Sequence, residues 1–256
     1  MLFIPRKKYE LLFLVLAALF AASLSEALNL KFLPTILLFF AVPAIFLSLR
    51  GRAYIARSLA FTLTMLVPLT IFDYLAYLDY SWFVPGSMWR ILRGGVAIET
   101  LVLNALWVYL VVMFWKYFCE PSLPGKFTEA VKYLLLFIVA GAAGFILIFS
   151  MNRLLLYVPY FYLALGLVFG VVPLIVFLLL YPKLVWRLLF LAGYFWVFLV
   201  IHEWVGLRHG QWFFGGSHYL GVVSFFGRRL PLEEILFWWG TSSPATVAWY
   251  KLFMDQ

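Results

Sequence analysis

The sequence predicts an all-α integral membrane protein with about eight transmembrane helices. Of its 256 residues, 66% are hydrophobic and only 12% are charged, whereas a soluble domain is about half apolar and a quarter charged. The mean hydropathy is +1.02, and long apolar stretches alternate with short polar breaks. The chain has too little polar surface to cover a soluble globule.

Eight apolar stretches are long enough to cross a hydrocarbon core of about 30 Å as helices. They fall near residues 11–28, 33–49, 54–76, 97–117, 130–150, 158–181, 184–205 and 232–252. The first stretch also has the basic start of a signal peptide, but its length and the apolar stretch that follows favour a span. The second stretch is the weakest prediction because it contains Pro34 and Pro43.

The distribution of Lys and Arg predicts the orientation. If the N-terminus is cytoplasmic, the inner segments hold twelve of these residues and the outer segments seven. The positive-inside rule therefore favours a multi-pass protein of the cell membrane with both termini in the cytoplasm. The net charge of +8 lies in short breaks between spans, which indicates headgroup contacts rather than nucleic-acid binding. The single cysteine, Cys119, excludes an internal disulfide and a Cys-rich metal site.

Two stretches 130 residues apart are similar. FDYLAYLDYSWFVPGS (72–87) and HEWVGLRHGQWFFGGS (202–217) share Trp, Phe, Gly and Ser at four positions. Further on, GGVAIETLVLNALW aligns with RRLPLEEILFWWGT if the second loop is four residues longer, so that Glu99 corresponds to Glu233. We therefore predict two parallel four-helix repeats, residues 1–122 and 123–256.

The acidic residues are concentrated in these matching stretches. Asp73 and Glu203 end the third and seventh predicted spans, and Glu99 and Glu233 begin the fourth and eighth. In repeats of the same topology all four lie at one face of the membrane, and we expect them to surround one cavity. Asp79 is expected to be a solvated loop residue.

The order of these features resembles the lycopene cyclase domain family, the cofactor-free, membrane-embedded type found as paired subunits or as a fused chain. The second repeat matches better, with HEWVGLRHGQWFFGGSHYLGV followed by PLEEILFW. The first repeat has AIET where Pro-x-Glu-Glu is expected, and His202 and Glu203 stand where an apolar or aromatic residue and aspartate are usual.

The resemblance implies an enzyme, an intramolecular lyase or isomerase that cyclises the end group of an acyclic carotenoid. A proton adds to the terminal double bond, the cation closes a six-membered ring, and a neighbouring proton leaves. The equation needs no redox cofactor, and no dinucleotide, phosphate-loop or zinc-protease motif is present in the sequence.

This chemistry needs a proton donor in a dry place and aromatic faces beside the cation. A carboxyl group in apolar surroundings can hold a proton at neutral pH, and aromatic rings stabilise a cation. We expect Glu233 to be the principal acid, because its counterpart Glu99 keeps the carboxyl group. The candidate catalytic residues are Glu233, Glu234, Glu99, Asp73 and Glu203. The candidate substrate-binding residues are Trp82, Phe83, Trp212, Phe213, Phe237 and Trp238.

Helical spacing joins these two groups. In an α-helix Phe237 lies one turn after Glu233, and Trp238 one turn after Glu234, so each ring would share a face with its acid. The same two glutamates follow Pro231 and also fit a simple helix cap.

Other interpretations stay open. His202, His209 and His218 have no common metal-ligand spacing, and no metal is expected. An interfacial aromatic belt explains Tyr157, Tyr160, Tyr162 and Trp249.

Two other functions compete with the carotenoid cyclase. One is another terpenoid cyclase or a prenyltransferase, although a prenyltransferase needs an Asp-rich magnesium motif that is missing. The other is a transporter or scaffold, although the acids gather at one face rather than at the midplane. The expected partners are an apolar polyene or terpenoid and the lipid bilayer.

Overall fold

The computed structural model describes residues 5–121 and 128–255, and this part of the chain is mostly helical. Seven helices in it are long and apolar enough to cross a membrane. They are Lys7–Leu28, Phe32–Arg50, Arg52–Asp79, Ile98–Cys119, Val131–Leu156, Phe161–Leu180 and Pro182–Arg208. These helices correspond to the first seven predicted spans, so the multi-pass helical fold is confirmed. The eighth predicted span is helical from Glu234 to Phe253.

The first four spans are built from straight and distorted segments. They are α1 (Pro5–Leu28), α2 (Phe32–Ile36), the π-helix η1 (Leu37–Ala41), α3 (Val42–Arg50), the 3₁₀ turn η2 (Arg52–Tyr54), α4 (Ile55–Asp79), α5 (Ile98–Phe114) and the π-helix η3 (Trp115–Cys119).

The remaining spans are built from the same kinds of helical segment. They are α6 (Val131–Asn152), η4 (Arg153–Leu156), α7 (Phe161–Leu165), the π-helix η5 (Gly166–Val171), α8 (Val172–Leu180), η6 (Pro182–Leu184), α9 (Val185–Arg208), the π-helix η7 (Glu234–Thr241) and α10 (Ser242–Phe253). The series of α-helix, π-helix, α-helix, 3₁₀ turn and α-helix therefore occurs both before α5 and before the loop that leads to η7.

Two prolines explain two of the π-helical segments. Pro43 and Pro173 lie in the first turn of α3 and α8, directly after η1 and η5. A proline has no N–H to donate to the preceding turn, and its ring clashes with the carbonyl there. The wider π turn accommodates both defects without ending the helix. The second span, which Pro34 and Pro43 made the weakest prediction, is therefore continuous.

Two β-hairpins, which the sequence did not predict, follow α4 and α9. β1 (Arg90–Ile91) pairs with β2 (Val96–Ala97), and β3 (Val222–Phe225) pairs with β4 (Arg228–Pro231). The second hairpin turns at Phe226 and Gly227, whose φ angles of 48° and 78° are both positive. A two-residue turn with two positive φ angles matches the twist of paired strands.

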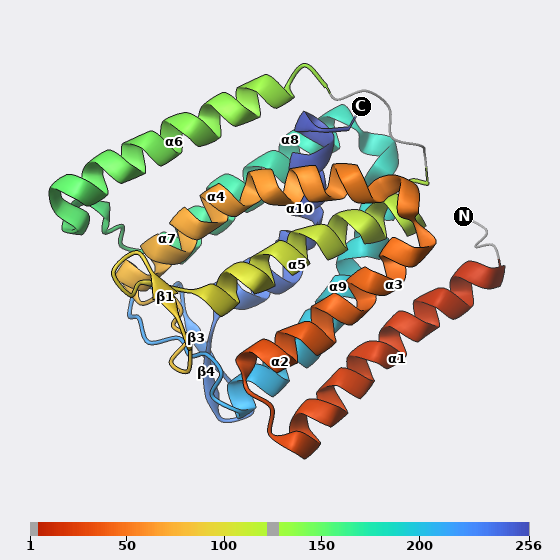
Figure 1. The fold of residues 1–256 in the computed structure, drawn as a ribbon, viewed down its shortest axis with the longest axis horizontal. Coiled ribbons are helices and arrows are strands. Elements are labelled where there is room, and N and C mark those ends of the chain that lie inside the picture. Colours follow the sequence, from red (N-terminus) through yellow and green to blue (C-terminus); the bar gives the residue numbers. More distant parts are fainter. Residues whose placement is uncertain (1–4, 122–127, 256) are drawn as a thin grey trace.

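The helices pack around α5, and the hairpins gather at one end of the bundle (Figure 1). α5 packs against α4, α3 and α10, while α9 packs against α1 and α10. Residues Trp107 to Phe114 of α5 are all buried. α6 packs against α4 at the edge of the bundle. α4 and α9 both end beside the hairpins, and α5 and η7 both begin there.

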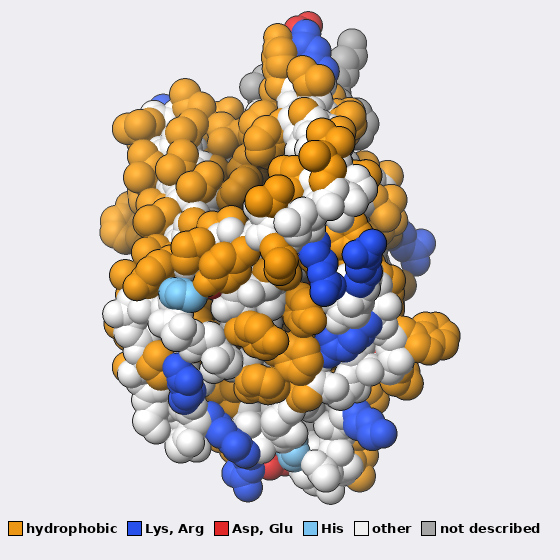
Figure 2. Space-filling view, turned by 90° about the vertical axis from the view of Figure 1, so that its left-hand side faces the viewer, with side chains coloured by type: hydrophobic (Ala, Val, Ile, Leu, Met, Phe, Trp, Pro, Cys, Tyr) orange, Lys and Arg blue, Asp and Glu red, His pale blue; other side chains and the backbone are white. Residues whose placement is uncertain are grey.

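The hairpin end carries exposed cations. Figure 2 shows Lys and Arg side chains on the lower part of this face and mostly hydrophobic side chains above them. The exposed cations of this end are Lys31, Arg93, Arg153, Arg208, Arg228 and Arg229. Cations on this surface can contact the phosphate groups of lipid headgroups.

The opposite end holds a buried group of charges, the Asp255 cluster, made of Arg57, Lys116, Glu120, Lys251 and Asp255. Asp255 lies 2.7 Å from Arg57, 2.9 Å from Lys116 and 3.4 Å from Lys251. Lys251 also contacts Glu120 at 3.1 Å. The cluster ties α4, η3 and α10 together at the end where the described chain finishes.

Candidate functional site

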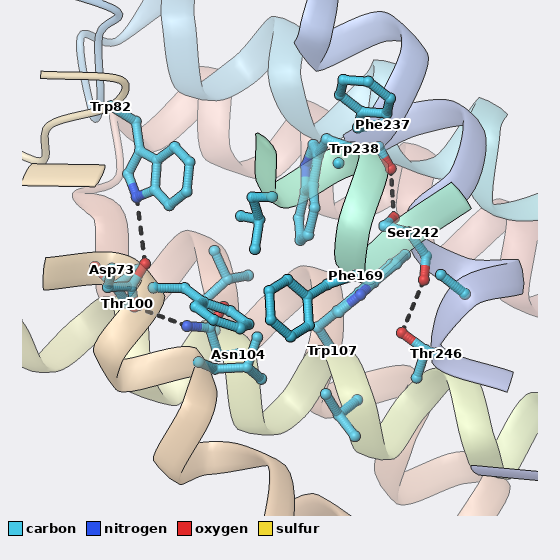
Figure 3. A pocket seen from close by; sticks show the side chains of 18 of the residues that line it. Asp73, Trp82, Thr100, Asn104, Trp107, Phe169, Phe237, Trp238, Ser242 and Thr246 are labelled. Atoms are coloured by element: carbon cyan, nitrogen blue, oxygen red, sulfur yellow. Dashed lines mark hydrogen bonds between the residues drawn. The ribbon is translucent and has the colours of Figure 1, made fainter. Parts of the chain in front are cut away.

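A cavity of about 250 Å³ lies among α4, α5, η5, η7 and α10 (Figure 3). Its walls are mainly aromatic and aliphatic, and three carboxyl groups, those of Asp73, Glu203 and Glu234, line it. Among the described residues that line it there is no Lys or Arg. These three acids are therefore not held there by ion pairs within the cavity wall.

Asp73 sits in the first of two acid centres. It is 7% exposed, and its Oδ1 accepts a hydrogen bond from Trp82 Nε1 at 3.2 Å. Its Oδ2 accepts a second bond from Asn104 Nδ2 at 2.8 Å. Figure 3 shows both bonds at one side of the cavity. Because both partners donate N–H groups, the carboxyl oxygens are held as acceptors that face the cavity.

Glu203 and Glu234 form the second centre. Glu203 is 1% exposed and Glu234 is 5% exposed, and their carboxyl groups lie close enough to interact with each other. Trp212 Nε1 donates to Glu203 Oε1 at 2.7 Å, and the Tyr162 hydroxyl donates to Glu234 Oε2 at 2.5 Å. Both carboxyl groups line the cavity, and each accepts a bond from an aromatic side chain.

The two centres are connected through their loops. Trp82 and Trp212 each bond the carboxyl group nine residues before them. The neighbouring residues Phe83 and Phe213 exchange two backbone hydrogen bonds, both 3.0 Å long, and their rings lie 5.3 Å apart. This reciprocal pairing fixes the two indole rings relative to each other and therefore orients both acids.

Glu99 and Glu233 lie outside the cavity lining. The Glu99 carboxylate accepts bonds from Ser87 Oγ at 2.5 Å and from the Met88 amide at 2.9 Å. Glu233 Oε1 accepts the Leu220 amide at 2.6 Å. Both side chains are buried and hold the loop that precedes their helix. Of the four acids expected around one cavity, Asp73 and Glu203 line it, and Glu234 joins them in place of Glu99 and Glu233.

The pairing of Phe237 with Glu233 assumed an α-helix, and that assumption was wrong. The segment from Glu234 to Thr241 is π-helical, so residues four apart no longer lie one above the other. Phe237 and Trp238 both line the cavity, whereas Glu233 faces the loop.

The aromatic candidates divide in a similar way. Trp82, Trp212, Phe237 and Trp238 line the cavity. Phe83 and Phe213 instead form the link between the two loops. Within the described residues, no group of three or more His, Cys, Asp or Glu side chains is arranged to hold a metal ion.

Some residues of the site were missed or misjudged from the sequence. Tyr162 and Trp249 line the cavity, and Tyr162 is 6% exposed, so neither belongs only to an interfacial belt. Asn104 is a lone amide in a long apolar stretch, and this feature of the sequence could have identified it as a residue of the site. Asp79, expected in solvent, is 4% exposed and bonds Ser81 Oγ and His218 Nδ1 at 2.8 and 2.9 Å.

Tyr219 secures the second loop against the first. Its hydroxyl lies 2.9 Å from the Ser81 carbonyl and 3.1 Å from the Tyr80 carbonyl, and it accepts the Gly216 amide at 3.2 Å. Burial raises the pKa of Tyr219 to about 12. The hydroxyl therefore keeps its proton at neutral pH and stays a donor to these carbonyls.

Gly206 leaves the space that Trp212 needs to reach Glu203. A Cβ atom at Gly206 would lie 1.8 Å from the Trp212 ring. We expect Gly206→Ala to displace this indole and to lower the free energy of unfolding by about 1–3 kcal/mol through overpacking. Thermal unfolding of the purified protein measures this.

Gly141→Ala is the matched control for Gly206→Ala. Gly141 also lies in a transmembrane helix, but nothing is within 4 Å of an added Cβ. It should unfold at or slightly above the parental temperature, because alanine favours a helix by up to about 1 kcal/mol. Equal stability of the two variants would contradict the close packing of Trp212 on Gly206.

Comparisons of the chain with known protein families, curated proteins and solved structures found no match. Its function is therefore inferred from the chemistry of the site itself.

Proposed function

We propose that this protein is a membrane-embedded, cofactor-free cyclase of an acyclic carotenoid end group. The observation that carries the proposal is the cavity itself, in which the neighbouring carboxyl groups of Glu203 and Glu234 and the separate carboxyl group of Asp73 face an aromatic space whose described lining contains no Lys or Arg. The likeness of the second loop and of PLEEILFW to the lycopene cyclase domain family supports the same assignment.

The proton steps balance without an external reagent. In this proposal the Glu203–Glu234 pair holds a proton and gives it to the terminal double bond, whose π electrons form the new C–H bond. The resulting cation is attacked by the next suitably placed double bond, which closes the ring. Asp73 accepts the proton lost from the neighbouring carbon, which restores a double bond. The product is an isomer of the substrate.

The walls suit a cationic intermediate. Trp82, Trp212, Phe237 and Trp238 present aromatic faces, which attract a cation without forming a bond to it. The volume of about 250 Å³ is slightly below the roughly 300–1,000 Å³ of pockets for small ligands. That space suits one end of a long polyene, while the rest of the chain lies toward the bilayer.

The two acid centres support the proposed parallel repeats. The equal spacing of nine residues in the two Trp–acid pairs and the reciprocal bonds of Phe83 and Phe213 are what two halves of the same topology would produce. In this proposal residues 1–122 and 123–256 each supply one centre, and the two centres share one cavity.

The test is expression of the protein in a bacterial host that accumulates lycopene, followed by chromatography of the pigments. We expect monocyclic or bicyclic products that are absent from the vector control. Unchanged lycopene in cells that contain folded protein in their membranes would reject this substrate. A prenyltransferase would instead consume a supplied prenyl diphosphate and a terpenoid acceptor.

The orientation follows as a separate prediction. Lys7 bonds the Tyr117 carbonyl at 2.5 Å and Asp255 bonds the adjacent Lys116, so both ends of the described chain lie at one end of the bundle. The Lys and Arg bias favours a cytoplasmic location for that end. A reporter fused after Gln256 should be active only in the cytoplasm, and activity confined to the outer side would reverse the assignment.

A further inference from the structure

A second, much smaller cavity lies beside Asp73, under the hairpin β1–β2. Its volume is about 10 Å³, which is close to the least space that holds one water molecule. Four of its residues, Asp73, Trp82, Val84 and Thr100, also line the main cavity. Asp73 therefore stands between the two spaces.

The small cavity has the polar partners that a buried water requires. The carboxyl group of Asp73, the hydroxyl of Thr100 and the guanidinium of Arg90 belong to residues that line it. A buried water makes two to four such bonds. Arg90 is only partly buried, and it donates to the carbonyls of Gly94 and Val84. Arg90 therefore lines the small cavity and is itself partly accessible at the loop.

The second acid centre differs at the corresponding place. In the alignment of the two halves Thr100 corresponds to Glu234, whose carboxyl group lies beside that of Glu203 and accepts a bond from the Tyr162 hydroxyl. The second half therefore has the carboxyl group of Glu234 beside Glu203. At the same place the first half has the hydroxyl of Thr100 and a water-sized space beside Asp73.

We propose that the small cavity binds one water molecule that carries protons between the loop face and Asp73, and that Asp73 therefore exchanges its proton faster than the Glu203–Glu234 pair, where Glu234 stands in the place of Thr100. In each exchange the water gives one proton to the Asp73 carboxylate and takes another from the loop face, or the reverse. In the proposed function this exchange removes the proton that Asp73 accepts in each turnover, and that role rests on the proposed function. The exchange itself does not depend on the proposed function.

Infrared spectroscopy tests the proposal without substrate. At a pH low enough to protonate Asp73, its carboxyl band is identified by its loss in Asp73→Asn, and that of the pair by its loss in Glu234→Gln. On transfer of the folded protein from H₂O to D₂O, we expect the Asp73 band to shift first. We expect Thr100→Val, which keeps the side-chain shape, to slow that shift about fivefold, the effect of one lost hydrogen bond.

Thr64→Val is the control, because Thr64 also lies in a membrane helix and its hydroxyl bonds the Ala60 carbonyl at 2.8 Å, but it is not among the residues that line either cavity. It should exchange at the parental rate. The proposal fails if the Asp73 band shifts no faster than the Glu234 band, if Thr100→Val has no effect, or if Asp73→Asn removes no carboxyl band. Absence of cyclase activity combined with the expected exchange would reject the proposed function alone.

Discussion

Glu234→Gln should lower the yield of cyclised product at least about 10²-fold, the usual contribution of a general acid. Glutamine has nearly the same shape, so Tyr162 keeps an acceptor and the helix keeps its packing. The amide cannot share a proton with Glu203, and the pair loses its function as a donor. The measurement is cyclised pigment per unit of folded protein in membranes of the lycopene-producing host.

Glu233→Gln is the matched control, one residue away. Its carbonyl can still accept the Leu220 amide, which bonds Oε1 at 2.6 Å, and the side chain does not line the cavity. We expect near-parental product. The reverse result, with loss at Glu233 and retention at Glu234, would restore Glu233 as the principal acid. Parental product from both variants would leave only a capping role for the two glutamates.

Which of the adjacent residues Glu233 and Glu234 lines the cavity could not be predicted from the sequence. Hydropathy located the spans because a backbone in lipid must satisfy its own hydrogen bonds and therefore forms helices. The internal similarity brought attention to Asp73 and Glu203. The direction of adjacent side chains depends on the local turn, however, and the π-helical start of the eighth span changes that direction for Glu233 and Glu234.

The partners of the acids were hidden for a different reason. Asn104 and Tyr162 reach Asp73 and Glu234 from helices that are 31 and 72 residues away in the chain. Such contacts depend on how helices pack, and hydrophobic periodicity carries no information about them. The hairpins were missed because Phe226 and Gly227 lack the Asn-Gly or Asp-Gly signal of common tight turns.

Asp255→Ala should lower the free energy of unfolding by about 3–5 kcal/mol, because removing one partner of a buried ion pair leaves the other charge poorly compensated. The side chain of Lys116 is 0% exposed and that of Arg57 is 7% exposed, and both bond Asp255. Thermal or denaturant unfolding in detergent measures the loss. Removing Glu129, whose pair with Lys132 is 3.7 Å long and exposed, should cost at most about 1 kcal/mol.

The pH dependence of the same cluster follows from its charges. Burial acts to raise the pKa of Asp255, but the hydrogen bond and charge of Lys116, the charge of Lys251 and the bond from Arg57 outweigh it, so the pKa lies below its usual value. A group with a lowered folded-state pKa stabilises the protein above its unfolded pKa, about 3.9 for Asp. The contribution of Asp255 should therefore be complete at neutral pH and disappear as the pH falls through the lowered value. If the parental protein and Asp255→Ala differ in stability as much in acid as at neutral pH, the ion pairs of Asp255 are not what holds this end of the bundle together.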